Sequence, residues 1–325
     1  MKVLVKGAGV AGLAVAHELA RRAAAVAVVD TRRRMDETAS WVAGGMLAPC
    51  CESETAGEAV LDLGRGAADW WERTLPGSVA RKGTLVVSPG RDSCELDRFA
   101  GRARGAGRLG KEALAALEPD LASRFPRALF FESEAHLDPR RLLPRLERAL
   151  SRMGVAFRRP AEAVGARYDV VVDCTGSARI GCDPALRGVR GEVLLLRSSE
   201  IRLSRPVRLL HPRFPVYVVP RGGGCFLIGA TMIETGRAGP ITARSTMELL
   251  NAAYALDPAF GEAEIVETGV GIRPAYPDNL PRVERRDATI SINGLYRHGF
   301  LLAPAMAQRA ADMILGGQPA ARGDR

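Results

Sequence analysis

The sequence predicts a mixed α/β (α+β) fold in which a unit of alternating strands and helices is interrupted by a second unit built on an antiparallel sheet. Three observations support this prediction. The first thirty residues follow a strand–helix–strand pattern, the middle of the chain is rich in short strands separated by glycine turns, and a strand–turn–helix pattern returns near the C-terminus. A chain of 325 residues is also too long for one ordinary domain.

The N-terminal segment has the clearest pattern. Val3–Val5 is typical of a buried strand, the glycine spacing G-x-G-x-x-G follows over Gly7–Gly12, and a helical pattern leads to a second strand, Val26–Val29, that ends at Asp30. The first glycine permits a tight turn, the second lets the backbone approach a pyrophosphate, and the third lets helix and strand pack closely. The N-terminus of the expected helix would attract the pyrophosphate, and Asp30 would accept hydrogen bonds from ribose hydroxyls. The segment predicts a Rossmann-like dinucleotide site.

The residues after this segment bear on which dinucleotide is bound. Three consecutive arginines at 32–34 would suit the 2′-phosphate of NADP, but the carboxylate of Asp30 would repel that phosphate. A solvated loop is therefore the better interpretation of these arginines. An NAD dehydrogenase would continue the strand–helix alternation through a full sheet, whereas here a small-residue, glycine-rich stretch follows at 40–49.

The rest of the chain supplies the remaining elements. Asp138 and Pro139 are a helix N-cap and a first-turn proline, and Pro144 is expected to kink that helix or delay its start. Further helices are expected at 57–75, 243–256 and 304–315, and strands at 83–87, 169–173, 189–196, 207–210, 216–219, 225–230, 264–270 and 289–293. We assign residues 1–82, 138–188 and 265–325 to a discontinuous nucleotide-binding domain, and residues 83–137 and 189–264 to a substrate-binding domain.

Composition excludes several classes of function. The net charge is +9, but only four of the 46 basic residues are lysines, and acidic residues are scattered among the arginines. This favours a general preference for arginine over a specific nucleic-acid surface. The six cysteines and four histidines show no metal-ligand spacing, so we expect no metal. No apolar run approaches the roughly 20 residues that cross a bilayer, and no signal peptide precedes the first strand, so we expect a cytoplasmic protein without membrane contact.

Motifs along nearly the whole chain indicate a family. They lie at residues 7–12, 43–49, 83–85, 136–139, 174–176, 188–192, 217–221, 229–232, 271–274 and 296–304. Together they resemble the FAD-dependent amino-acid oxidases of the D-amino-acid oxidase type, most closely the glycine-oxidising branch associated with thiamin synthesis. The resemblance implies a Rossmann-like FAD-binding domain with an inserted antiparallel-sheet substrate domain. It also implies noncovalent FAD, because the branch with covalent flavin uses a C-terminal cysteine and none follows Cys225 here.

The resemblance also implies which residues form the site. The cofactor would contact Gly7, Gly9, Val10, Ala11, Gly12, Asp30, Thr31, Ala39, Ser40, Gly44, Gly45, Met46, Thr175, Gly176, Leu295, Tyr296, Arg297, His298, Gly299, Phe300 and Leu301. The substrate would contact Arg273, Arg297, Tyr217 and Met232. The adenine contact, Ala161 or Ala163, stays open because the 154–169 stretch is shorter than in the family.

Residue chemistry supports the substrate assignments. An arginine binds a carboxylate through two parallel hydrogen bonds and stays charged, which suits Arg273 as the anchor of an amino acid, and the hydroxyl of Tyr217 can add a neutral hydrogen bond. Alternatives stay open at each position. Arg273 could bond a backbone carbonyl, Tyr217 could be core, Arg297 could serve the pyrophosphate or the fold, and Met232 could be packing.

The expected function is FAD-dependent oxidative deamination of glycine. A hydride would pass from Cα, with the amine neutral, to the flavin, and the products would be the imine or glyoxylate, ammonia and hydrogen peroxide. The partners would be a small amino acid, oxygen, the thiazole synthesis machinery and further copies of the chain. The alternatives are a flavin amine oxidase or dehydrogenase acting on sarcosine or small D-amino acids with oxygen or another acceptor, and a basic flavoprotein that binds RNA weakly.

Overall fold

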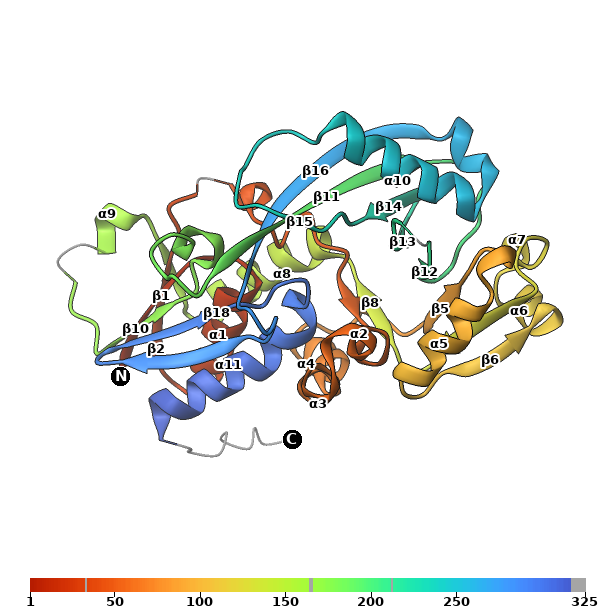
Figure 1. The fold of residues 1–325 in the computed structure, drawn as a ribbon. Helices are drawn as coiled ribbons and strands as arrows, with labels where there is room; N and C mark the ends of the chain where they lie inside the picture. The colour runs from red at the N-terminus through yellow and green to blue at the C-terminus, as the bar shows by residue number, and fades with distance from the viewer. Residues whose placement is uncertain (33, 164–165, 212, 317–325) are drawn as a thin grey trace.

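The computed structural model describes residues 1–32, 34–163, 166–211 and 213–316, and it contains two large sheets and one small one (Figure 1). The six-stranded sheet has the order β17-β18-β10-β1-β2-β9, with β17 as its antiparallel edge strand and the other pairs parallel. Its strands are β1 (Lys2–Lys6), β2 (Ala25–Val29), β9 (Ala156–Arg158), β10 (Val170–Asp173), β17 (Arg282–Arg286) and β18 (Thr289–Asn293).

Helices bury the middle of this sheet because its central strands, β1 and β2, are mostly apolar. The residues Val3 and Val5 of β1 are fully buried, and they share one core with the long helices α1 and α11, which lie side by side in Figure 1. The helices of this core are α1 (Val10–Arg21), α3 (Glu58–Gly64), α4 (Ala67–Thr74), α8 (Pro139–Arg152) and α11 (Gly299–Leu315).

The second large sheet has nine strands, mostly antiparallel, in the order β15-β11-β14-β13-β12-β5-β7-β6, with β16 paired along β11. Its strands are β5 (Thr84–Val87), β6 (Gly107–Gly110), β7 (Arg127–Phe131), β11 (Arg187–Arg197), β12 (Val207–Leu209), β13 (Val216–Gly222), β14 (Cys225–Gly229), β15 (Ile233–Glu234) and β16 (Glu264–Ala275). The helices packed on it are α5 (Cys94–Arg102), α6 (Lys111–Leu117), α7 (Pro119–Ala122) and α10 (Ala243–Leu256).

A small third sheet joins the two large ones. It pairs β3 (Met46–Leu47) and β4 (Val79–Ala80) with β8 (Ala135–Leu137). The short helices α2 (Pro49–Ala56) and α9 (Pro160–Ala163) complete the elements, with 3₁₀ turns at Met35–Glu37, Gly90–Asp92, Gly176–Arg179 and Pro258–Glu262.

Several expected elements differ in extent from the sequence prediction. The helix expected at 57–75 is two helices with a break before Ala67, and the strand expected to end at Val270 continues to Ala275 because β11 pairs with it along its full length. Arg273 therefore lies within β16, opposite Val189, and not at a strand end.

The C-terminal helix begins earlier than expected, at Gly299, and runs through Pro304. A proline inside a helix leaves the carbonyl four residues earlier without its usual partner. Here that carbonyl is Phe300, and it accepts a hydrogen bond from Nε1 of Trp71 at 2.8 Å. The helix tolerates its proline because a side chain from α4 replaces the missing donor.

Two findings concern membranes and metals. Within the described ranges no helix is both long and apolar enough to span a bilayer. Over the same residues, no group of three or more histidine, cysteine, aspartate or glutamate side chains is arranged to hold a metal ion.

Candidate active site

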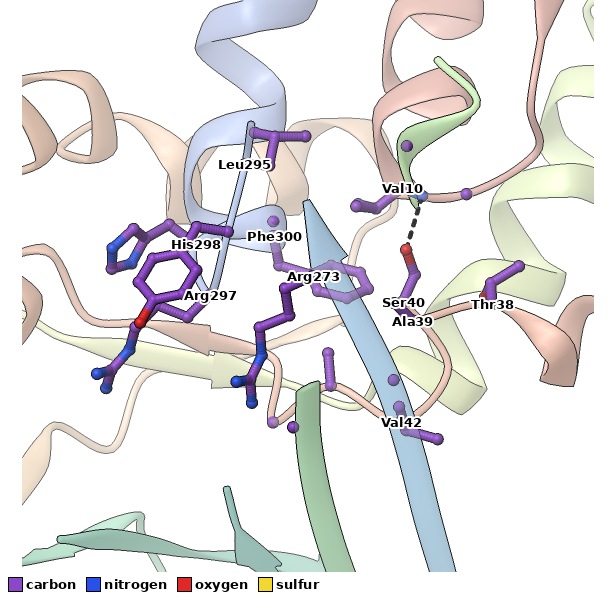
Figure 2. Close-up of a pocket in the computed structure, with 18 of the residues that line it drawn as sticks. Val10, Thr38, Ala39, Ser40, Val42, Arg273, Leu295, Arg297, His298 and Phe300 are labelled. Atoms are coloured by element: carbon purple, nitrogen blue, oxygen red, sulfur yellow. Dashed lines mark hydrogen bonds between the residues drawn. The ribbon is translucent and has the colours of Figure 1, made fainter. Parts of the chain in front are cut away.

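Residues of both large sheets line one cavity, and Figure 2 shows part of its lining. In the six-stranded sheet, β2 and β10 lie on opposite sides of β1, so the glycine turn after β1 is at a topological switch point. Ligands of α/β sheets bind at such points, beyond the carboxyl ends of the strands. The opposite wall of the cavity comes from β11, β13, β14 and β16.

The N-terminus of α1 opens into this cavity. Gly9, Val10 and Ala11 line it, and the N–H of Val10 donates to Oγ of Ser40 at 3.1 Å, the dashed line in Figure 2. A Cβ on Gly9 would meet only that hydroxyl, at 3.4 Å, so a ligand can approach the backbone. A Cβ on Gly12 would lie 1.8 Å from the carbonyl oxygen of Gly7, so the helix packs this closely on the turn only with glycine there.

The carboxylate of Asp30 is already bonded within the chain. It accepts the N–H of Ala8 at 2.6 Å, and Nε and Nη2 of Arg32 at 3.0 and 2.9 Å. Burial alone would raise the pKa of Asp30, but these hydrogen bonds lower it below its usual value. Arg32, which we expected in a solvated loop, instead pairs with Asp30 and lines the cavity.

A half-buried arginine shapes the small-residue loop at 43–46. The guanidinium of Arg221 donates to the carbonyl oxygens of Leu137 at 3.1 Å, of Ala43 at 3.1 Å and of Gly44 at 2.8 Å. Gly45 has a φ of +69°, and a Cβ there would lie 2.1 Å from the Leu137 oxygen. This loop therefore keeps its path along the cavity through a glycine and through two hydrogen bonds from one side chain of β13, which also bonds β8 at Leu137.

Arg273 is a cation of the cavity with no carboxylate partner among the described residues. Its Nη1 donates to the carbonyl oxygen of Thr231 at 3.0 Å, and within the described part of the chain it forms no ion pair. Burial, and then the charge of Arg297, lower its pKa to about 10, so it remains charged at neutral pH. Its guanidinium lies against the Cα of Gly191, where a Cβ would be 2.1 Å from Nη2.

Arg297 is paired with a carboxylate that the sequence analysis did not single out. Its Nε lies 3.0 Å from Oε2 of Glu52, and its Nη2 lies 3.3 Å from Oε1. The hydroxyl of Tyr217 donates to the same Oε1 at 2.9 Å. Glu52 is only 5% exposed, and although burial favours the neutral acid, the charges of Arg297 and Arg208 help to lower its pKa to about 2. Glu52 is therefore a carboxylate at working pH.

His298 closes this cluster as a neutral group. Its Nδ1 lies 3.4 Å from Oε2 of Glu52, but the side chain is buried and neither ring nitrogen has a hydrogen-bond partner among the described residues. Burial lowers its pKa to about 4. The imidazole is uncharged at pH 7, so the ion-pair partner of Glu52 is Arg297 and not His298.

The structure brings most of the expected site residues to this cavity. Those that line it are Gly9, Val10, Ala11, Ala39, Ser40, Gly44, Gly45, Met46, Thr175, Gly176, Tyr217, Met232, Arg273, Leu295, Tyr296, Arg297, His298, Gly299, Phe300 and Leu301. Gly7, Gly12, Asp30 and Thr31 do not line it. The two alanines proposed for the adenine, Ala161 and Ala163, are also absent from its walls.

Glu52 is the functional candidate that the sequence analysis missed. It lies in the first turn of α2, in the run Pro49-Cys50-Cys51-Glu52, where an acidic residue is typical of a solvated helix N-terminus. The only available signal was its position directly after the small-residue stretch at 40–49. Its partners, Tyr217 and Arg297, are 165 and 245 residues away in the chain, so the pairing could not be read from local spacing.

Comparison with known proteins decides the family. A family model described as FAD dependent oxidoreductase matches residues 2–313. The chain belongs to this family of FAD-dependent oxidoreductases. An oxidoreductase of Rhizobium etli, whose name ThiO links it to thiamine biosynthesis, is 59% identical over 99% of this chain and 99% of its own length. A glycine oxidase of Geobacillus kaustophilus is 29% identical, over 96% of this chain and 92% of its own.

Solved structures agree on the fold of this oxidoreductase. The crystal structure of glycine oxidase from Geobacillus kaustophilus has a TM-score of 0.79 at 25% identity and covers 98% of this chain and 95% of its own. The iminodiacetate oxidase IdaA of Chelativorans sp. BNC1 has a TM-score of 0.82 at 23% identity, with coverage of 98% and 96%, and shows the same fold. The expected fold class, the enzyme class and FAD as the cofactor are thus confirmed.

The residues present fit FAD. The cavity joins a helix N-terminus with an approachable glycine backbone to a second strand–glycine–helix unit, in which Leu295 to Leu301 lead into α11. A helix N-terminus suits a pyrophosphate, since its first N–H groups lack helical partners. The loop at 43–46 and the strands β11 and β16 enclose the remaining length of the cavity with small residues, including Gly44, Gly191 and Gly271.

Proposed function

We propose that the enzyme oxidises glycine to its imine, with oxygen as the acceptor and FAD bound noncovalently. In this reaction glycine loses a Cα–H and an N–H, two electrons pass to oxygen, and the products are iminoacetate and hydrogen peroxide. Water then converts the imine to glyoxylate and ammonia. The observation that carries the proposal is the charged Arg273 guanidinium, which faces the cavity without a carboxylate partner.

The chain's own residues would bind and orient the substrate. Arg273 would take the glycine carboxylate through charge-assisted hydrogen bonds, and its fixed position against Gly191 would hold the substrate in one orientation. Met232, which is 49% exposed and has its sulfur 3.5 Å from Nη1 of Arg297 and from the hydroxyl of Tyr296, would cover the substrate at the cavity mouth. In this structure the hydroxyl of Tyr217 donates a hydrogen bond to Glu52, so it would support the site through that carboxylate.

FAD supplies the two-electron acceptor when it is bound. The N-terminus of α1 and Ser40 would hold its pyrophosphate, and the backbone at 43–46 and 295–301 would contact its ring system. Asp30 would receive the ribose hydroxyls alongside Arg32. We assign no general base. Among the described residues that line the cavity the one histidine, His298, is buried against Glu52, and a neutral amine needs no further proton removal before oxidation.

The test is the visible spectrum of the purified holoenzyme under anaerobic conditions. We expect glycine to bleach the flavin and air to restore it. Arg273→Met should keep bound flavin but lose bleaching at glycine concentrations that saturate the wild type, whereas Arg244→Met, which removes an exposed arginine from α10, should bleach normally. A wild-type flavin that ignores glycine but bleaches with sarcosine or D-alanine would move the assignment to another small amine.

Thiamin synthesis is the pathway that the similarity supports for this reaction. The relative at 59% identity carries the name ThiO, and proteins named ThiO/ThiG in Synechocystis and Nostoc match 96% of this chain with only about half of their own length. We propose that the imine is handed to thiazole synthesis. Deleting the gene should then create a thiamin requirement under aerobic growth, and a deletion strain that grows without thiamin would contradict the proposal.

A further inference from the structure

Two arginines of the cavity differ in their electrostatic state. Figure 2 shows the side chains of Arg273 and Arg297 extending in the same direction, and their charges are close enough to affect each other. Arg297 is paired with Glu52 through two contacts of 3.0 and 3.3 Å, whereas Arg273 has only the Thr231 carbonyl. Near these arginines the cavity therefore presents one uncompensated positive charge, and not two.

The surroundings of Glu52 hold its side chain in place and keep it ionised. Its side chain is 6% exposed, Tyr217 donates to Oε1, and the residue lies in the first turn of α2, where the helix dipole favours a negative charge. Its neighbour Glu54 points elsewhere and pairs with Arg102 and Arg208. Of the two glutamates, only Glu52 lines the cavity.

We propose that Glu52 determines substrate specificity by neutralising Arg297, so that the site accepts amines with one carboxylate and disfavours amines with two. A ligand's first carboxylate binds Arg273. A second anionic group would need a second free cation, and the cation beside Arg273, which is Arg297, is already paired with Glu52. The proposal rests on the proposed function for the identity of the amine.

A dicarboxylic amine is a realistic competitor on this fold. An oxidase named for iminodiacetate shares the fold at a TM-score of 0.82. Glycine and iminodiacetate differ by one carboxymethyl group on the nitrogen, so discrimination between them depends on how the site treats one additional negative charge. A site can discriminate against a ligand by an unfavourable charge alone, because this needs no change in the contacts to the preferred ligand.

The test compares two non-oxidisable ligands on the holoenzyme. Methoxyacetate has the shape of sarcosine with one carboxylate, and oxydiacetate has the shape of iminodiacetate with two. Their dissociation constants follow from the change in flavin absorbance on titration. In wild type, methoxyacetate should bind more tightly. In Glu52→Gln, which keeps the shape of the side chain and the acceptor for Tyr217, the preference should shift towards oxydiacetate by about tenfold or more, since tenfold is about 1.4 kcal/mol.

Two further variants make the outcome specific. Glu54→Gln removes the same charge from the same helix outside the cavity and should leave the preference unchanged. Arg297→Gln tests the pair from the other side: Glu52 without its cation should repel the second carboxylate, so oxydiacetate should bind even more weakly relative to methoxyacetate. If Glu52→Gln purifies without flavin, the change in ligand preference measured in Arg297→Gln decides whether the proposal holds.

A preference that changes by less than about twofold in both cavity variants would overturn the proposal. So would a Glu52→Gln variant that loses affinity for glycine while its ether ligands bind as before, because Glu52 would then recognise the substrate ammonium. These titrations need no turnover. The proposed function can therefore fail, with no bleaching by glycine, while the charge selectivity is still measured.

Discussion

Replacing Gly191 by alanine should disable the carboxylate anchor without unfolding the protein. A Cβ at this position would lie 2.1 Å from Nη2 of Arg273, 2.3 Å from Cζ and 2.7 Å from Nη1. Ordinary contact begins near 3.4 Å. The guanidinium must therefore move by about 1 Å or more, and as the far end of a flexible side chain it can do so into the cavity. The movement also strains its bond to the Thr231 carbonyl.

The size of the effect follows from the hydrogen bonds that are displaced. A hydrogen bond to a charged group contributes about 1.5–3 kcal/mol. Loss of one such bond to the substrate carboxylate lowers kcat/KM for glycine by roughly 10- to 150-fold. A misplacement of about 1 Å in an active site can lower the reaction rate by about 100-fold, which falls in the same range.

The assay is steady-state oxygen consumption with glycine, together with flavin content and the thermal unfolding midpoint. Gly110→Ala is the matched control, because Gly110 also lies in the nine-stranded sheet, has a φ of −84°, and would place its Cβ in open space. We expect both variants to keep flavin and near wild-type midpoints, and only Gly191→Ala to lose activity. A Gly191→Ala enzyme with kcat/KM within threefold of wild type would refute the role of Arg273 as the anchor.

Three further predictions concern other contacts. Glu134 is fully buried, and burial raises its pKa from 4.5 to about 7. The folded state therefore binds a proton more tightly than the unfolded state, and the free energy of unfolding falls as pH rises from about 4.5 to 7. Glu134→Gln should remove that fall, a difference of about 3 kcal/mol at pH 8 in chemical denaturation, and an unchanged dependence of stability on pH would contradict the prediction. Arg221→Met frees two carbonyls of the 43–46 loop and that of Leu137, and should weaken FAD retention about tenfold or more in dialysis against flavin-free buffer. Trp71→Phe leaves the Phe300 carbonyl unbonded beside Pro304 and should lower the free energy of unfolding by about 1–3 kcal/mol, which a urea titration would detect.

Much of the candidate site could be predicted from the sequence because its signals are local. The G-x-G-x-x-G turn, the strand before it and the helix after it are neighbours in the chain, and Gly12 is required by its contact with the Gly7 carbonyl in the same segment. The helix at 243–256 and the strand at 289–293 have the predicted bounds, since their hydrophobic periodicity and caps are also local. The motifs that carried the family resemblance are of the same kind.

Long-range contacts explain what the sequence could not provide. The sequence placed Arg273 and Arg297 in the site but could not show that one is free and the other paired. That difference depends on Glu52, which meets Tyr217 and Arg297 only because α2, β13 and the turn before α11 converge on one cavity. The early start of α11 likewise depended on Trp71, more than 200 residues away.

The sequence by itself therefore determined the features that are encoded in short segments: a dinucleotide turn, an α/β architecture and two arginines that line the cavity. The tertiary structure decided which of these two arginines is paired with a carboxylate. A charge is set by every group within a few ångströms in space, and in a chain folded through two interleaved sheets those groups come from distant positions that no local pattern connects.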